Sequence, residues 1–275
     1  RAPDVYYALN FGGNLLRGYT LNSVMSTLGD QTNWLAGDLY TNRNKTWKIA
    51  KYHNTIRPHT ARKDEMHKLY NWAKLFYENG VDVVIESDAH VVKTTWPLKP
   101  SNGPRSHEGF VRDDQKGTVY IGEGGWGAPL RVCNDNKPWT RASGSFNQFK
   151  WIFVDKYKIE IRTVKTKGSA YVHDVSRDDR FSEPYGLDVW EPSTGKVVTI
   201  NKAGSIEPQD APGFNEELMT NRGVSVEEFA AKNNGPSIMV SWETGKEPRG
   251  MIYEVQRSLD NGRTYKSVVD ITGKG

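Results

Sequence analysis

Two apolar runs separated by an amphipathic segment constrain the fold of this chain more than any other feature. Residues 47–52 and 81–85 are short and rich in β-branched and aromatic side chains, which is typical of buried strands. Between them, apolar residues recur at three- and four-residue steps from Met66 to Tyr77, the spacing of a helix packed on a sheet. A strand, a helix and a strand in this order form a βαβ unit, in which the two strands run parallel. The sequence therefore predicts an α/β sheet with both strands ending at one edge.

Polar side chains follow each of the two strands at that edge. His53 comes directly after the first strand, while Asp88 and His90 follow the second. Imidazole and carboxylate groups are ligands that divalent metals accept. The loop between His53 and the helix also holds Arg57 and His59. We therefore expect a metal site at the carboxyl edge of the sheet.

Composition narrows the class of protein. The 275 residues suffice for a core without disulfide or metal staples, and the single cysteine, Cys133, offers neither a disulfide framework nor a cysteine zinc site. The 37 basic and 33 acidic residues form no block of like charge, so the sequence does not predict nucleic-acid binding. No run of about 18 apolar residues is present, so no membrane-spanning helix is predicted.

The sequence predicts three parts along the chain. We expect residues 1–168 to form the α/β part, 169–235 an irregular extension rich in Pro, Asp and Gly, and 236–275 a partial β-sandwich similar to part of a fibronectin-III-like domain. Further expected elements are strands at 5–11, 14–21 and 118–122, a helix at 31–39, a loop at 97–117, a hairpin of 149–154 with 158–164, and strands at 238–242, 251–257 and 264–269.

The order of these pieces resembles the calcineurin-like metallophosphoesterases, in particular their purple-acid-phosphatase-like branch. In that family a strand ends in a metal-binding histidine, a helix follows, and the next strand ends in Gly-His-x-His; here that stretch is Ser87-Asp88-Ala89-His90. Gly117-Thr118-Val119-Tyr120 and Gly124-Gly125 follow at suitable spacing, and the resemblance covers residues 4–165. It implies the C-terminal half of a four-layer α-β-β-α sandwich.

The resemblance also implies a chemistry. Two divalent or trivalent metal ions (Zn, Fe, Mn or Mg) activate a water that hydrolyses phosphomonoesters or diesters. His53 and Asp88 are expected to bind one metal and His90 the other. His59 is expected to protonate the leaving group, and Arg57 to contact phosphate oxygens.

Two departures from the family pattern leave alternatives open. Asp88 stands where the family has the first histidine of its motif, and the family's earlier motifs (Asp-x-His, Gly-Asp and Gly-Asn-His) are missing from residues 1–275. An N-terminal segment or a second chain is therefore expected to carry the other ligands. The alternative is a non-catalytic phosphatase-fold module that binds a ligand or a partner protein. Because the chain starts at Arg1, without a Met, we expect either secretion or periplasmic export with processing, or a truncated protein.

Overall fold

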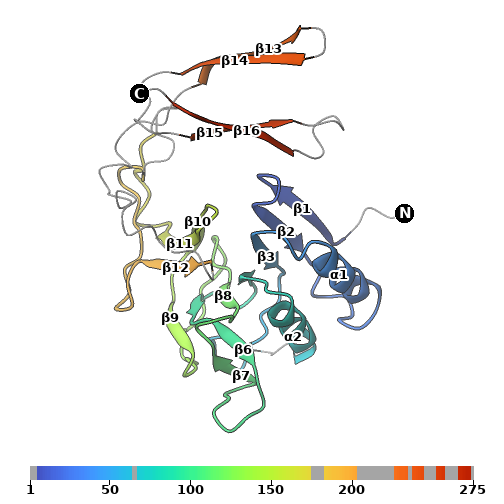
Figure 1. The fold of residues 1–275 in the computed structure, drawn as a ribbon. Helices are drawn as coiled ribbons and strands as arrows, with labels where there is room; N and C mark the ends of the chain where they lie inside the picture. Colours follow the sequence, from blue (N-terminus) through green and yellow to red (C-terminus); the bar gives the residue numbers. More distant parts are fainter. Residues whose placement is uncertain are drawn as a thin grey trace. The chain divides into compact units, whose positions relative to one another are not determined.

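The computed structural model describes residues 5–63, 67–174, 183–202, 226–234, 237–244, 252–257 and 266–273 (Figure 1). The chain divides into two units. The first comprises Arg1–Tyr171 with Gly186–Ser205, and the second Val172–Tyr185 with Ile206–Gly275. All the expected site residues belong to the first unit.

A seven-stranded mixed sheet forms the centre of the first unit. Its strands are, in spatial order, β1 (Tyr7–Phe11), β2 (Leu16–Thr20), β3 (Trp47–Lys51), β4 (Val83–Ile85), β8 (Val119–Gly122), β5 (Val92–Thr95) and β9 (Thr140–Gly144). Strands β2, β3, β4 and β8 run parallel, whereas β1, β5 and β9 pair antiparallel to their neighbours. The parallel pairing of β3 with β4 confirms the predicted βαβ unit.

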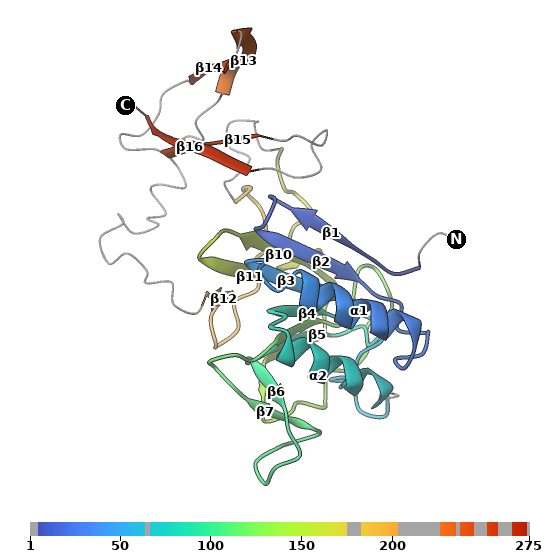
Figure 2. The same cartoon turned by 45° about the vertical axis from the view of Figure 1, so that its right-hand side comes forward.

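Two helices cover one face of this sheet (Figure 2). They are α1 (Asp30–Thr41) and α2 (Tyr70–Glu78), the latter preceded by a 3₁₀ turn at His67–Leu69. The apolar stripe of α2 buries Trp72, Ala73 and Phe76 against β-strand residues such as Val84 and Tyr120. The apolar spacing in the sequence therefore indicates which face of α2 packs on the sheet, because only that face must be apolar.

A second, antiparallel sheet packs on the opposite face. It consists of β10 (Gln148–Val154), β11 (Lys158–Lys165) and β12 (Val197–Asn201). Ile159, Ile161 and Val198 from this sheet form one apolar cluster with residues of the main sheet, among them Trp47 and Val119. The hairpin of β10 and β11 was predicted from its alternating pattern.

The structure differs from the expected fold in two respects. The described residues form three layers, helices, sheet and sheet, and no second helical layer is among them. The ranges expected to be loop or irregular also contain strands: β6 (Leu98–Pro100) pairs with β7 (Phe110–Arg112), and β12 completes the second sheet. These strands are short or lie in Pro- and Gly-rich sequence, so they carry too few residues for a period to be recognised.

The second unit contains two antiparallel pairs. Strand β13 (Val226–Asn234) pairs with β14 (Ser237–Thr244), and β15 (Ile252–Arg257) with β16 (Lys266–Thr272). Residues 258–265, which include the start of the strand expected at 264–269, lie outside the described residues. Within the described part of the chain, every helix is too short or too polar to cross a membrane.

Candidate functional site

His53 and Asp88 meet at the carboxyl edge of the parallel strands. His53 follows β3 and Asp88 follows β4, and the two connections are joined by a hydrogen bond from the Ser87 N–H to the His53 carbonyl, 2.9 Å long. His53 Nε2 lies 3.8 Å from Asp88 Oδ1, and the two side chains are 66% and 21% exposed. The βαβ geometry thus places two of the expected ligands at the sheet edge that the sequence predicted, with their side chains in contact.

The other oxygen of Asp88 is already bound by two donors. Lys63 Nζ lies 3.0 Å from Asp88 Oδ2, and the side-chain amide of Asn54 donates to the same atom at 3.2 Å. Burial acts to raise the pKa of Asp88, but the hydrogen bond and charge of Lys63 outweigh it and hold that pKa below its ordinary value. Asp88 is therefore a carboxylate at neutral pH, with Oδ1 on the side of His53.

The turn that carries Asp88 and His90 is held in a strained conformation. Both residues have positive φ angles, 69° and 57°, which non-glycine residues rarely adopt. Arg131 Nη1 donates to the Asp88 carbonyl at 2.6 Å, and the Arg131 N–H reaches the His90 carbonyl at 3.3 Å. The His90 N–H donates to the Glu123 carbonyl at 2.8 Å. Strain of this kind persists only where several contacts fix the backbone, and it is frequent at functional sites.

The ring of His90 is fixed by one backbone contact. Its Nδ1 lies 2.9 Å from the Pro129 carbonyl oxygen. A carbonyl only accepts, so Nδ1 carries the hydrogen and, in the neutral ring, Nε2 keeps its lone pair. This arrangement orients metal-binding histidines in proteins. Gly124 lies against the same turn, since a Cβ built there would be 3.5 Å from the Asp88 nitrogen and 3.8 Å from His90 Cδ2.

These residues fit one part of a metal centre. Two ligands of one tetrahedral ion lie about 3.4 Å apart, close to the separation of the His53 and Asp88 atoms. Across the described residues, however, no group of three or more His, Cys, Asp or Glu side chains could hold a metal ion. The chain therefore offers a two-ligand pair and, in the same turn as Asp88, an oriented His90.

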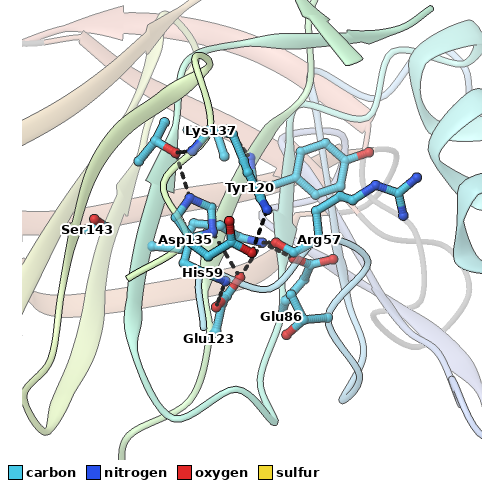
Figure 3. A network of polar contacts seen from close by, with 12 residues as sticks. Arg57, His59, Glu86, Tyr120, Glu123, Asp135, Lys137 and Ser143 are labelled. Carbon is cyan, nitrogen blue, oxygen red and sulfur yellow. Dashed lines mark hydrogen bonds and ion pairs between the residues drawn. The ribbon is translucent and has the colours of Figure 1, made fainter. Parts of the chain in front are cut away.

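His59 and Arg57 lie away from solvent. His59 is 0% exposed, its Nε2 lies 2.7 Å from Thr140 Oγ1, and its Nδ1 lies 3.4 Å from Glu123 Oε1 (Figure 3). Arg57 donates from Nε to the Glu108 carbonyl at 2.8 Å and from Nη1 to the Ile56 carbonyl at 2.8 Å. These contacts argue against the expected roles of His59 as a leaving-group acid and of Arg57 as a phosphate ligand, because neither group is open to a substrate.

Beneath the turn lies a buried ionic network that the sequence reasoning missed. Lys93 Nζ lies 2.6 Å from Glu86 Oε2 and 2.6 Å from Glu123 Oε1. Glu86 also accepts from the Tyr52 hydroxyl at 2.9 Å. A signal was present in the sequence: Glu86 and Glu123 each end an apolar strand, and Lys93 interrupts a third. Lys63, Asn54 and Arg131 left no comparable signal, because they lie in polar loops.

One of the comparisons with known proteins supports this fold. No family model and no curated protein matches the sequence. Among solved structures, purple acid phosphatase PPD1 from yellow lupin (Lupinus luteus) seeds superposes with a TM-score of 0.53 at 15% identity, over 71% of this chain and 32% of that chain. The chain shares the fold of a metallophosphoesterase.

Two further structures superpose less closely. GAP50, the anchor in the inner membrane complex of Plasmodium, gives a TM-score of 0.43 at 11% identity, over 69% of this chain and 55% of that one. PhoD gives 0.47 at 10% identity, over 72% and 42%. The chain therefore spans between about a third and about half of the length of these three structures.

Proposed function

We propose that this chain supplies one side of a metal-dependent phosphoesterase centre that hydrolyses phosphomonoesters or diesters. His53 and Asp88 bind one metal ion and His90 the other, while an N-terminal segment or a second chain supplies the remaining ligands. The observation that carries the proposal is the pair formed by His53 Nε2 and Asp88 Oδ1, 3.8 Å apart at the end of two parallel strands. The shared fold with a purple acid phosphatase supports it.

Within this proposal the residues of the chain have separate tasks. The bound metals supply Lewis-acid polarisation of the phosphoryl group and a water of lowered pKa. The Pro129 carbonyl keeps the proton of His90 on Nδ1, so that Nε2 retains a lone pair for a metal ion. Arg131 holds the Asp88 carbonyl and thereby the left-handed turn. Lys63, beside the Asp88 carboxylate, is a point charge able to contact a phosphate oxygen.

A second candidate function has one observation in its favour. Lys63 and Asn54 already satisfy Asp88 Oδ2, so the carboxylate has a counter-charge without a metal. A phosphatase-fold module that only binds a ligand or a partner protein needs such a counter-charge, because it has no metal ion to neutralise Asp88. Metal binding separates the two candidates.

The test is metal affinity, measured by isothermal titration calorimetry with Mn²⁺ and Zn²⁺ and by elemental analysis of the protein with any co-purifying chain. We expect His53→Ala and His90→Ala each to weaken binding at least about 100-fold, since even supporting residues of metal sites are worth about 10–100-fold. His107→Ala, which removes an exposed histidine elsewhere in the same unit, is the control. Absence of saturable metal binding by the protein together with the segment or chain that carries the remaining ligands, or equal affinity in all variants, refutes the enzyme and favours the binding module.

A further inference from the structure

A cavity of about 1050 Å³ lies at the end of the parallel strands opposite to His53 and Asp88. Its lining includes the residues at the starts of β3, β4 and β8, together with strand β12. Parallel strands begin at one edge of a sheet and end at the other, so this cavity is separate from the proposed metal site. Both lie within the first unit of the chain.

Positive charge predominates in the lining. Six basic residues line the cavity, against the acidic Glu78, Asp82 and Asp114; the basic ones are Arg43, Lys45, Lys48, Lys116, Arg141 and Lys202. Lys202 lies 3.7 Å from Asp82. Among the residues that the structure describes, the other five basic side chains form no ion pair. The cavity thus has more cations than its own carboxylates neutralise.

Lys48 is the most buried of these cations. It is 4% exposed, and the contact of its Nζ is with the Arg43 carbonyl at 3.5 Å, at the limit of hydrogen bonding. Asp82 Oδ2 accepts the backbone N–H of Lys48 at 2.8 Å instead of its ammonium. Burial lowers the pKa of Lys48, and the charge of Lys202 adds to this effect while that of Asp82 opposes it. A buried ammonium with one weak partner is costly unless an anion joins it.

The neighbouring cations have neutral partners. Lys45 Nζ donates to the Gly13 carbonyl at 3.1 Å and to Asn14 Oδ1 at 2.9 Å, and Arg43 Nη1 donates to the Tyr40 carbonyl at 3.0 Å. At the far end, Arg141 Nη2 donates to the Thr194 and Val197 carbonyls at 2.6 and 3.0 Å. Carbonyl partners fix these groups in place but leave their charge unneutralised.

We infer that the Lys48 end of this cavity binds the anionic group of a small polyanion, a molecule that carries several phosphates or carboxylates. The ligand supplies the missing counter-charge of Lys48, with Lys45 as the second cation. Arg141 on β9 lies four strand spacings from β3, about 19 Å, so it does not share this anionic group. At physiological salt, charges this far apart are screened from each other.

The test is calorimetric titration of the full chain with tripolyphosphate and, separately, with citrate at 0.15 M salt. We expect saturable binding of at least one of them, which Lys48→Met weakens about tenfold or more, because a hydrogen bond to a charged group contributes about 1.5–3 kcal/mol. The stronger of the two probes identifies the anionic group as phosphate or carboxylate. Lys45→Met, expected to weaken binding about threefold by removing the second charge at this end, decides the question if Lys48→Met does not fold.

The controls are matched to each residue type. Lys74→Met removes an exposed lysine outside the cavity, Arg141→Met removes a cation at its far end, and His53→Ala alters the proposed metal site. We expect all three to retain the parent affinity within about twofold, because Lys74 is exposed and does not line the cavity, and Arg141 and His53 lie beyond the screening length from Lys48. No saturable binding of either anion, or equal losses in the Lys48 and Lys74 variants, overturns the inference. Because the probes contain no metal, this outcome is independent of the proposed phosphoesterase.

Discussion

Replacing Lys93 by methionine tests the buried network beneath the candidate site. Lys93 lies on β5, its side chain is 1% exposed, and its ammonium separates the carboxylates of Glu86 and Glu123. Methionine keeps much of the volume and removes the charge, so two buried carboxylates remain without a counter-ion. We predict that Lys93→Met lowers the free energy of unfolding at pH 7 by about 3–5 kcal/mol, the usual loss when one partner of a buried ion pair is removed.

The geometry sets this magnitude. At an effective dielectric constant near 20, each 2.6 Å contact of the ammonium contributes about 6 kcal/mol before desolvation. The cost of burying the three charges offsets most of this gain, and removal of Lys93 leaves that cost in place for both carboxylates. The net loss is therefore several kcal/mol, well below the gross sum.

The same contacts set the direction of the pH effect. Burial acts to raise the pKa of Glu123, but the charge of Lys93 and the hydrogen bond of His59 outweigh it and hold that pKa below its ordinary value. In the parent protein, the stability that comes from the lowered pKa of Glu123 is present above the pKa of the unfolded state and is lost as pH falls through the pKa of the folded state. In Lys93→Met the lysine charge no longer opposes burial, so the pKa of Glu123 in the folded state rises. Protonation of Glu123 then removes an unpaired buried charge and restores part of the stability. We therefore expect a smaller loss at pH 5 than at pH 7.

Urea unfolding at pH 7 and pH 5, followed by tryptophan fluorescence, measures the loss. The buried Trp47, Trp72 and Trp139 belong to the first unit and report its unfolding. Lys74→Met is the control, and Glu123→Gln in the Lys93→Met background is expected to restore part of the stability by removing one unpaired charge. A loss below about 1 kcal/mol at pH 7, or an equal loss at both pH values, refutes this reasoning.

Two further predictions concern the same region. Gly122→Ala is expected to lower the free energy of unfolding by about 2–6 kcal/mol, because φ is +144° and a Cβ would lie 2.0 Å from the Glu86 carbonyl oxygen. Gly127→Ala is the control for backbone strain alone, because its φ is +75° and no atom lies within 4 Å of the added Cβ. Equal losses of the two variants in urea unfolding exclude the clash. Burial lowers the pKa of Lys150 to about 7, although the charge of Glu123 acts in the other direction. The unfolded state then binds more protons from pH 7 to about 10, so stability rises with pH over that window, and Lys150→Met is expected to remove this slope in urea titrations at pH 6, 7, 8 and 9. An unchanged slope contradicts the assignment to Lys150.

The sequence by itself determined the elements with strong periodicity and their order. The strands at 47–51 and 83–85, with the helix between them, follow from apolar spacing, because one face of each must be buried. Their parallel pairing follows from the connection between them, and it places His53 and Asp88 at one edge. The position of these two residues at one edge was therefore predictable without coordinates.

Tertiary structure alone decided which side chains meet within that frame. His59 and Arg57 look exposed in a polar loop, yet the loop folds inward and buries both. The ammonium of Lys63 reaches Asp88, and that of Lys93 reaches Glu123, across connections whose path no local pattern describes. The physical reason is that periodicity encodes only which face of an element is apolar. The pairing of charges depends on loop paths and on long-range strand order, which are set when the sheet assembles.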